Sequence, residues 1–291
     1  MLSGHLGVVG RVTTVLVPPR PVLSLRHAAT VGWAAGAGAV LAQIVFPLTD
    51  GALALTLGCV ALFALASVSH AVARFGPWRA AGLVTVAGGG GLLAELLGVA
   101  TGFPFGHYAY SGTLGWAVDG VPAVVPAAWT MMAYPALLVG RRLVGRAGRP
   151  AVVVVAAWAL ASWDVFLDPQ MVDAGHWRWV SPTPSLPGVD GIPVTNFAGW
   201  LLVALLMMAL LDRVLDHGGP ASAAGSAVDD RLPVVLYLWT YASSVLAHTV
   251  FFGRPTVALV GGLAMGLVAV PLAVDLRRRG VRAVEAGERE A

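Results

Sequence analysis

The sequence predicts an all-α, polytopic integral membrane protein with about eight transmembrane helices. Hydrophobic residues make up 57% of the 291 residues and charged residues only 11%, whereas a soluble domain carries about 25% charged residues. Apolar windows of roughly 20 residues are long enough to cross a bilayer. Such windows lie at about 27–46, 51–73, 80–101, 121–140, 150–168, 193–212, 232–252 and 256–275.

The arginines orient these windows. All 18 basic residues are arginine, and with the N-terminus inside all except Arg178 and Arg254 fall in cytoplasmic segments. This bias follows the positive-inside rule and predicts an even number of spans with both termini in the cytoplasm. We therefore expect a cytoplasmic tail at 1–26, one transmembrane domain at 27–275, and a basic then acidic cytoplasmic tail at 276–291. The expected location is the cell membrane.

Composition excludes several classes of function. The chain has no lysine, so it offers neither the Schiff-base amine of a retinal protein nor the lysine of a phosphate-binding loop. The single cysteine, Cys59, permits no intramolecular disulfide. Nucleic acid is not an expected partner, because the arginines cluster in short loops between spans.

The histidines give no pattern for oxygen activation. None of the seven has the H-x-x-x-H or H-x-x-H-H spacing of membrane di-iron enzymes. A metal site built from Glu95, His107, His176 and the aspartates is a less favoured alternative. We expect no metal and no cofactor.

Glycine and aromatic residues mark special segments. The run Gly88–Gly91 indicates either a closely packed helix face or a locally weak helix. The stretch 213–231 has the composition of a flexible cytoplasmic linker. Two long outer loops, 102–120 and 169–192, are rich in aromatics, glycine and proline. They are either an interfacial aromatic belt or functional loops.

Two aspartates end the fifth apolar window. Asp164 and Asp168 are four residues apart, which places both carboxyls on one helix face. Pro169 is expected to end that helix. An unpaired acid in an apolar segment is costly, so this pair suggests chemistry, ion handling or a salt bridge. The alternative is that Asp168 is an ordinary helix-end residue in interfacial water.

Polar residues of four spans fall at a similar depth. With a rise of about 1.5 Å per residue, Glu95, Asp164 and His248 lie in the outer third of the bilayer. Asn196 enters its span from the outside, only a few residues deep. Intramembrane ionisable residues are candidates for function, so we expect these four side chains to meet.

The order and spacing of several motifs resemble the CruF-type carotenoid hydratases, a family described broadly as carotenoid biosynthesis proteins. The motifs include one outer loop, the two aspartates and the start of the sixth span. They lie at 102–110, 121–122, 126–129, 163–169, 177–179 and 191–200. The resemblance implies addition of water to the terminal isopropylidene double bond of an acyclic carotenoid end, C40 or C50, giving a tertiary alcohol. It implies a substrate dissolved in the bilayer, with other carotenoid-pathway membrane enzymes as candidate partners.

The residues fit this chemistry, which needs a proton donor, a stabilised tertiary cation and one water. A carboxylic acid in an apolar site stays protonated and can donate. We expect Asp164 to be the donor, Asp168 to tune it and Glu95 to bind or activate the water. Aromatic faces can stabilise the cation, and a polar side chain can position the water. The aromatic candidates are Trp163, Trp116, Trp129, Trp177, Tyr108 and Tyr110, and the polar ones are Asn196, His107 and His248.

Two other classes of function remain open. A proton-coupled lipid transporter would also use intramembrane acids, but it favours them near the midplane within an inverted repeat. The sequence shows no clear repeat. A non-catalytic partner subunit of a prenyl-transfer or cyclase enzyme would explain the spans and aromatics, but not the converging acids.

Overall fold

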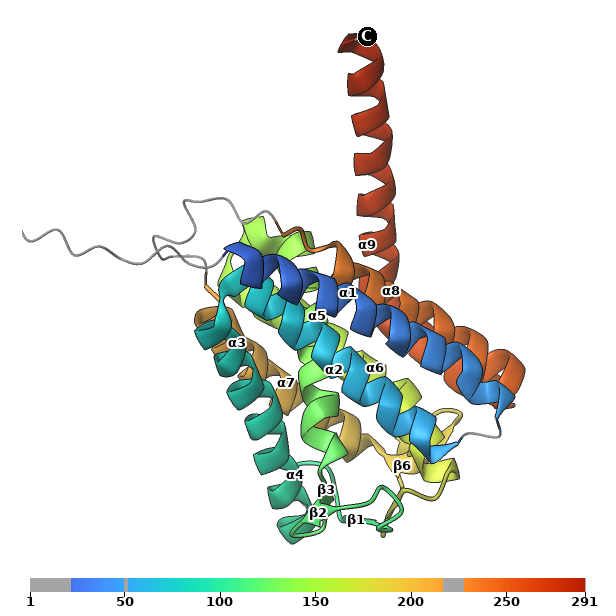
Figure 1. Ribbon diagram of the computed structural model, residues 1–291. Helices are drawn as coiled ribbons and strands as arrows, with labels where there is room; N and C mark the ends of the chain where they lie inside the picture. Colours follow the sequence, from blue (N-terminus) through green and yellow to red (C-terminus); the bar gives the residue numbers. More distant parts are fainter. Residues whose placement is uncertain (1–21, 50–51, 217–227, 291) are drawn as a thin grey trace, which may run out of the picture.

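The computed structural model describes residues 22–49, 52–216 and 228–290, with side chains described between 26 and 281, and it confirms the all-α membrane fold (Figure 1). Within these ranges, 7 helices are long and apolar enough to cross a membrane. Most of the predicted tail 1–26 and of the predicted linker 213–231 lies outside the described residues. Helix α1 already begins at Val22, and α9 continues as a helix through the expected tail to Glu290.

The helices pack into one bundle, and the C-terminal part of α9 projects from it (Figure 1). Short 3₁₀ or π-helical segments extend or join several of them. In chain order the helical elements are α1 (Val22–Val45), η1 (Phe46–Leu48), α2 (Leu53–Phe75), α3 (Pro77–Leu83), η2 (Val84–Gly89), α4 (Gly90–Thr101), α5 (Val124–Val144), η3 (Gly145–Ala147), α6 (Arg149–Asp173), α7 (Val194–Val214), α8 (Arg231–Leu246), η5 (Ala247–Phe251) and α9 (Pro255–Glu290).

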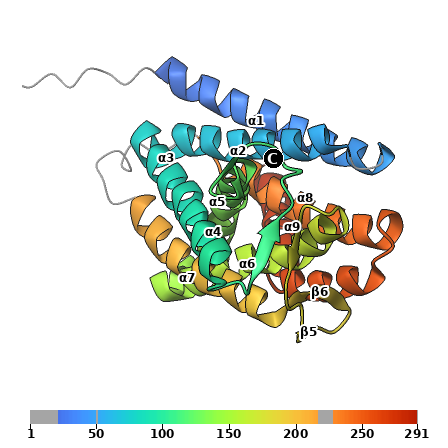
Figure 2. The same cartoon turned by 90° about the horizontal axis from the view of Figure 1, so that it is seen from below.

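Helix α5 accounts for the predicted span 121–140, but it is not among the seven. It lies in the middle of the bundle (Figure 2), and its residues 129–140 are all buried. A helix that is surrounded by other helices does not contact lipid, so its surface need not be apolar all round. This is why α5 can carry Thr130, Tyr134 and the internal Pro135.

The prediction that a helix ends at Pro169 is wrong. Helix α6 continues through this proline to Asp173. Proline lacks the N–H that would bond the carbonyl of Val165, which weakens the helix at one place. Pro169 is buried, and α6 packs against α5, α7 and α9 along its length. This packing keeps the last turn helical.

The close-packing interpretation of the glycine run is confirmed for part of the run. The π-helical segment η2 covers Val84–Gly89, so the helix is irregular there. The run also packs closely, because a Cβ built on Gly91 would lie only 2.4 Å from Cγ of Trp129 on α5. Gly89 and Gly90 have nothing within 4 Å of such a Cβ. The contact face is therefore confined to part of the run.

The two outer loops fold together into a cap at the lower end of the bundle in Figure 1. Trp179 ties one loop to the other by donating its indole N–H to the carbonyl of Phe105 at 2.9 Å. The cap contains three antiparallel pairs of short strands, β1 (Tyr108–Tyr110) with β4 (Trp177–Trp179), β2 (Ala117–Val118) with β3 (Val121–Pro122), and β5 (Ser185–Leu186) with β6 (Val189–Pro193).

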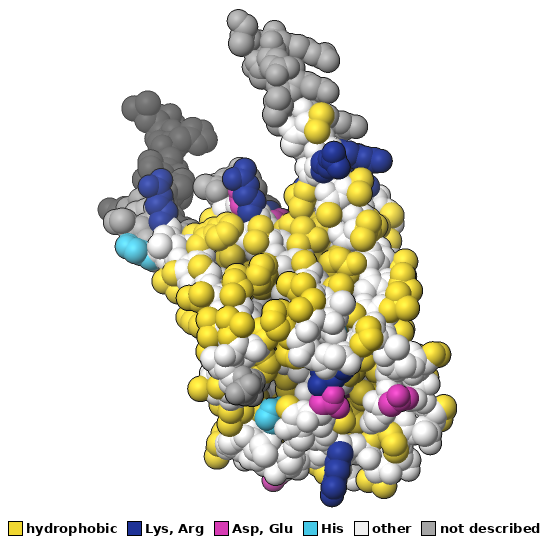
Figure 3. Space-filling model, turned by 90° about the vertical axis from the view of Figure 1, so that its right-hand side faces the viewer, with side chains coloured by type: hydrophobic (Ala, Val, Ile, Leu, Met, Phe, Trp, Pro, Cys, Tyr) yellow, Lys and Arg dark blue, Asp and Glu magenta, His cyan; other side chains and the backbone are white. Residues whose placement is uncertain are grey.

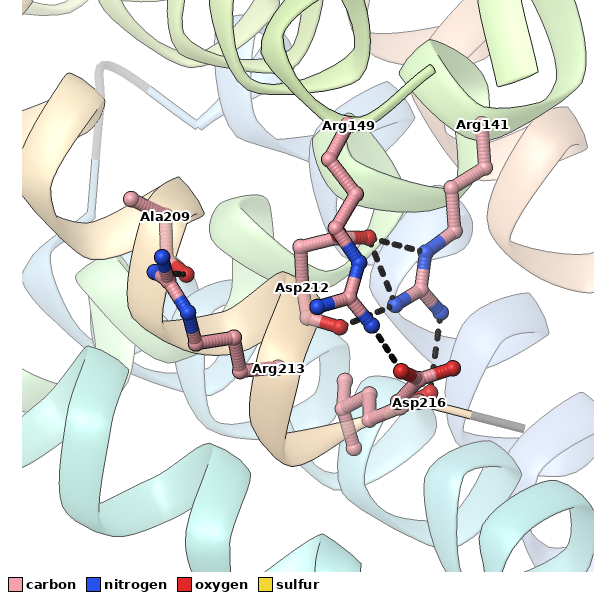
Figure 4. A network of polar contacts seen from close by, with 7 residues as sticks. Arg141, Arg149, Ala209, Asp212, Arg213 and Asp216 are labelled. Atoms are coloured by element: carbon pink, nitrogen blue, oxygen red, sulfur yellow. Dashed lines mark hydrogen bonds and ion pairs between the residues drawn. The ribbon is translucent and has the colours of Figure 1, made fainter. Parts of the chain in front are cut away.

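Charged side chains gather at the two ends of the bundle, and hydrophobic side chains cover the face between them (Figure 3). At the end opposite the cap, Arg141 on α5 donates to Asp212 on α7 at 2.8 Å and to the carbonyl of Leu215 at 3.0 Å. Arg149 and Asp216 extend this network (Figure 4). That this end is cytoplasmic stays a prediction.

Candidate active site

A cavity lies under the cap, between α2, α4, α5, α6 and α7. Its empty space, including the part that opens outward, is about 690 Å³. We name it the acid cavity, because Glu95 and Asp168 are in its wall together with Asn196. Its aromatic lining comprises Phe105, Tyr108, Tyr110, Trp129, Trp177, Trp179 and Trp200.

Glu95 on α4 accepts hydrogen bonds from three neutral donors. The hydroxyls of Tyr108 and Tyr110 lie 2.5 and 2.8 Å from Oε2, and the indole N–H of Trp129 lies 3.2 Å from Oε1. The tyrosines come from β1, outside the spans, where burial and the charge of Glu95 raise the pKa of Tyr110 well above its ordinary value. Its hydroxyl therefore stays a donor. The cap and the central helix together fix this carboxyl.

Asp164 and Asp168 share one partner. Both lie on the same face of α6, as the spacing predicts, and the amide nitrogen of Asn196 donates to each of them. Its distance to Oδ2 of Asp164 is 2.8 Å. The indole of Trp177 donates to Oδ1 of Asp168 at 3.1 Å. Asp168 is only 3% exposed, so it is not a water-exposed helix-end residue.

The two aspartates differ in their access to the acid cavity. Asp168 is in the cavity wall, whereas Asp164 lies behind it and is fully buried. Oδ1 of Asp164 has no hydrogen-bond partner. No arginine or histidine lines the cavity. Two carboxylates that share one amide, with no arginine or histidine among the described residues of the cavity wall, cannot both be ionised at low cost, so the arrangement favours a proton on the pair.

Aromatic rings form much of the remaining wall or pack directly behind it. Trp129 stacks on Trp200 with 4.0 Å between the ring centroids, and Trp163 meets Trp200 edge to face at 6.2 Å. Tyr108 lies 5.7 Å from Trp179. The faces of such rings attract a positive charge. The acid cavity therefore combines the carboxyl of Asp168, which is paired with Asp164 behind the wall, the fixed carboxyl of Glu95 and a lining that suits a cation.

Comparison with known proteins identifies the family. Residues 51–270 match the family model described as "Carotenoid biosynthesis protein", which covers most of the chain. The chain belongs to the carotenoid biosynthesis protein family. It is also similar to a bisanhydrobacterioruberin hydratase of Haloarcula japonica, with 32% identity over 165 residues. That similarity covers 55% of this chain and 54% of the relative, about half the length of each. No solved structure matches the chain.

The structure of this carotenoid biosynthesis protein brings together most of the residues expected at the site, though not all of them. The acid cavity collects two of the acids, the amide and four of the expected aromatics. Asp164 joins them through Asn196. The predicted residues in the cavity wall are Glu95, Asp168, Asn196, Tyr108, Tyr110, Trp129 and Trp177.

Four predicted residues lie elsewhere. Trp163 and His248 line a second cavity beside the first, described below. Trp116 is 75% exposed, and His107 is also exposed on the cap; neither lines a cavity described here. A metal site built on the loop histidines is not assembled, because no group of three or more His, Cys, Asp or Glu among the described residues is placed to hold a metal.

Three aromatic residues of the wall were not predicted as site residues, although the sequence carries signals for two of them. Trp179 follows Trp177 by two residues in a strand, so both side chains point to the same face of β4. Trp200 follows Asn196 by four residues in α7, which again gives one face. Phe105 had no such signal, because its position depends on how the cap folds.

Proposed function

We propose that this protein adds water to the terminal isopropylidene double bond of an acyclic carotenoid end group, C40 or C50, and forms a tertiary alcohol. One observation carries the proposal. Asp168, joined to Asp164 through Asn196, faces an aromatic cavity with no cation in its wall. The printed name of the Haloarcula japonica relative, a hydratase, supports the same reaction.

The reaction begins with proton transfer from the aspartate pair. Asp168 delivers the proton to the alkene carbon that carries a hydrogen, and the π electrons form the new C–H bond. The positive charge then sits on the carbon that carries the two methyl groups, beside the faces of Trp129 and Trp200. In this scheme Asp164 acts through Asp168, which revises the sequence-based expectation of a direct donor role.

Water then adds to the cation. The water oxygen forms a bond to the tertiary carbon and loses one proton to Glu95, whose position is fixed by Tyr108 and Tyr110. Return of that proton to the aspartate pair completes the cycle, so that one alkene and one water give one alcohol. No redox step occurs and no cofactor is consumed.

The location and partners follow from the substrate. A C40 or C50 polyene dissolves in lipid, and seven apolar helices indicate a membrane protein. We propose that it resides in the cell membrane, takes its substrate directly from the bilayer and works beside other membrane enzymes of the carotenoid pathway.

Pigment analysis tests the reaction. The chain is expressed in a host that makes only the acyclic precursor, and the extract is examined by chromatography and mass spectrometry. A pigment heavier by one water is expected, and growth in H₂¹⁸O should label its hydroxyl. Label from ¹⁸O₂ would refute hydration. Unchanged pigment, with the protein present in the membrane, would favour a partner subunit or a transporter.

A further inference from the structure

A second cavity adjoins the acid cavity. It encloses about 800 Å³, including its open part, between α1, α2, α6 and α8. Its lining is more polar than that of the acid cavity and includes Gln43, Gln170, Thr240, Ser243, Ser244 and His248. The two cavities have four lining residues in common, Thr56, Val60, Leu167 and Met171. The two cavities are therefore neighbours that share part of their wall.

His248 in the second cavity has one nitrogen without a partner. Its side chain is 1% exposed, and Nε2 lies 3.1 Å from the carbonyl oxygen of Phe166. A carbonyl can only accept, so Nε2 carries the hydrogen. In the neutral ring Nδ1 is then an acceptor, and it is buried without a partner. Buried acceptors are normally satisfied, so this atom calls for a donor from a ligand.

Gln43 can complete the recognition of such a group. Its side-chain carbonyl accepts the indole N–H of Trp239 at 2.5 Å, which leaves its amide NH₂ group as a donor in the cavity lining. A hydroxyl group donates one hydrogen bond and accepts others. The lining of the second cavity thus offers hydroxyl groups both an acceptor, on His248, and a donor, on Gln43.

We propose that the second cavity is a hydroxyl-binding subsite in which Nδ1 of His248 accepts a hydrogen bond from a ligand O–H group. Two sources have this chemistry: a tertiary hydroxyl already present on the carotenoid, or a water molecule bound before it reacts in the acid cavity. The first source makes His248 a determinant of substrate specificity, and the second makes it part of the water supply. The inference rests on the proposed hydration reaction and extends it.

Two substitutions separate ligand recognition from a structural role. His248→Gln keeps an N–H that can reach the carbonyl of Phe166 but lacks the acceptor at the Nδ1 position. His248→Asn keeps an acceptor near that position but loses the bond to Phe166. The proposal expects the glutamine variant to be the more impaired, whereas a purely structural histidine predicts the reverse. Thr249→Val is the matched control, because Thr249 is exposed on the same segment.

The first measurement is binding. The purified full-length protein in lipid nanodiscs is titrated with two acyclic carotenoids that differ by one tertiary hydroxyl, and the shift of the polyene absorption is followed. If the ligand hydroxyl is the source, His248→Gln weakens binding of the hydroxylated carotenoid by about three- to tenfold, the effect of one hydrogen bond, and leaves binding of the other unchanged.

The second measurement is the rate of hydration, and it tests whether the group bound by His248 is a water molecule. In that case both carotenoids bind His248→Gln as they bind the wild type, while hydration slows by a similar factor for both. The subsite is refuted if His248→Gln binds and hydrates both carotenoids like the wild type, or if only His248→Asn is impaired. Failure of the proposed function is a different result: the wild type itself then forms no hydrated product.

Discussion

Replacement of Gly91 by alanine should disable the acid cavity, although the changed residue does not line it. Gly91 on α4 faces Trp129 on α5, and a Cβ there would lie 2.4 Å from Cγ of Trp129. Ordinary contact begins near 3.4 Å, so the indole must move by the difference, about 1 Å. Trp200 is stacked on the ring with centroids 4.0 Å apart and restricts that movement.

The expected magnitudes follow from this displacement. The bond from Trp129 to Glu95 is already 3.2 Å long, and a further 1 Å breaks it. Overpacking costs about 1–3 kcal/mol, and replacing glycine by alanine within a helix returns about 1 kcal/mol. The net loss of stability is therefore about 0–2 kcal/mol. A misplacement of about 1 Å at a reacting centre can lower the rate by about 100-fold.

Gly90→Ala is the matched control, because a Cβ on the neighbouring glycine has nothing within 4 Å. It should be as active as the wild type and slightly more stable. Product per unit of membrane protein is measured by chromatography of the pigments, and stability by thermal unfolding in detergent. The role given to Trp129 is wrong if Gly91→Ala and Gly90→Ala are equally active.

Three further predictions concern the acids, the orientation and the inner end of the bundle. Asp164→Asn and Asp168→Asn should each lower the rate of hydration by at least 100-fold while the protein still accumulates in the membrane. If both variants instead form nearly as much product as the wild type and Glu95→Gln forms none, Glu95 is the proton donor and the aspartates have the other role. An alkaline phosphatase fused behind α9 should be inactive, because the positive-inside rule places that end in the cytoplasm; activity would reverse the assigned orientation. Arg141→Met should destabilise the protein by about 1–3 kcal/mol, because the buried carboxylate of Asp212 then keeps only its longer ion pair with Arg149. Adding Asp212→Leu should recover most of this loss in thermal unfolding.

The sequence predicted the all-α fold because the length and apolar composition of the windows reflect the bilayer directly. Counting windows did not show that the segment 121–140 becomes the buried centre of the bundle. The end of α6 was also mispredicted, because a local rule about Pro169 was applied where packing on three neighbouring helices decides.

The candidate site was predicted only in part, because spacing along a helix gives less than the packing of the helices. Spacing of four residues placed Asp164 and Asp168 on one face, and depth arguments brought Asn196 and Glu95 to the same level. Helical spacing and depth do not give the direction in which each face points. The sequence therefore did not reveal that Asp168 faces the cavity with Asp164 behind it, nor that His248 faces the second cavity.

The proposed roles of the acids, with the aspartate pair as proton donor and Glu95 as proton acceptor, follow from the number of hydrogen bonds that each carboxyl accepts. Glu95 alone receives three donors, from Tyr108, Tyr110 and Trp129. The two aspartates together also receive three, and one oxygen of Asp164 receives none. Donors stabilise a carboxylate over its acid, so a proton shared among these groups costs least on the aspartate pair. In the proposed mechanism the aspartate pair is therefore the acid and Glu95 the base, and hydration needs both.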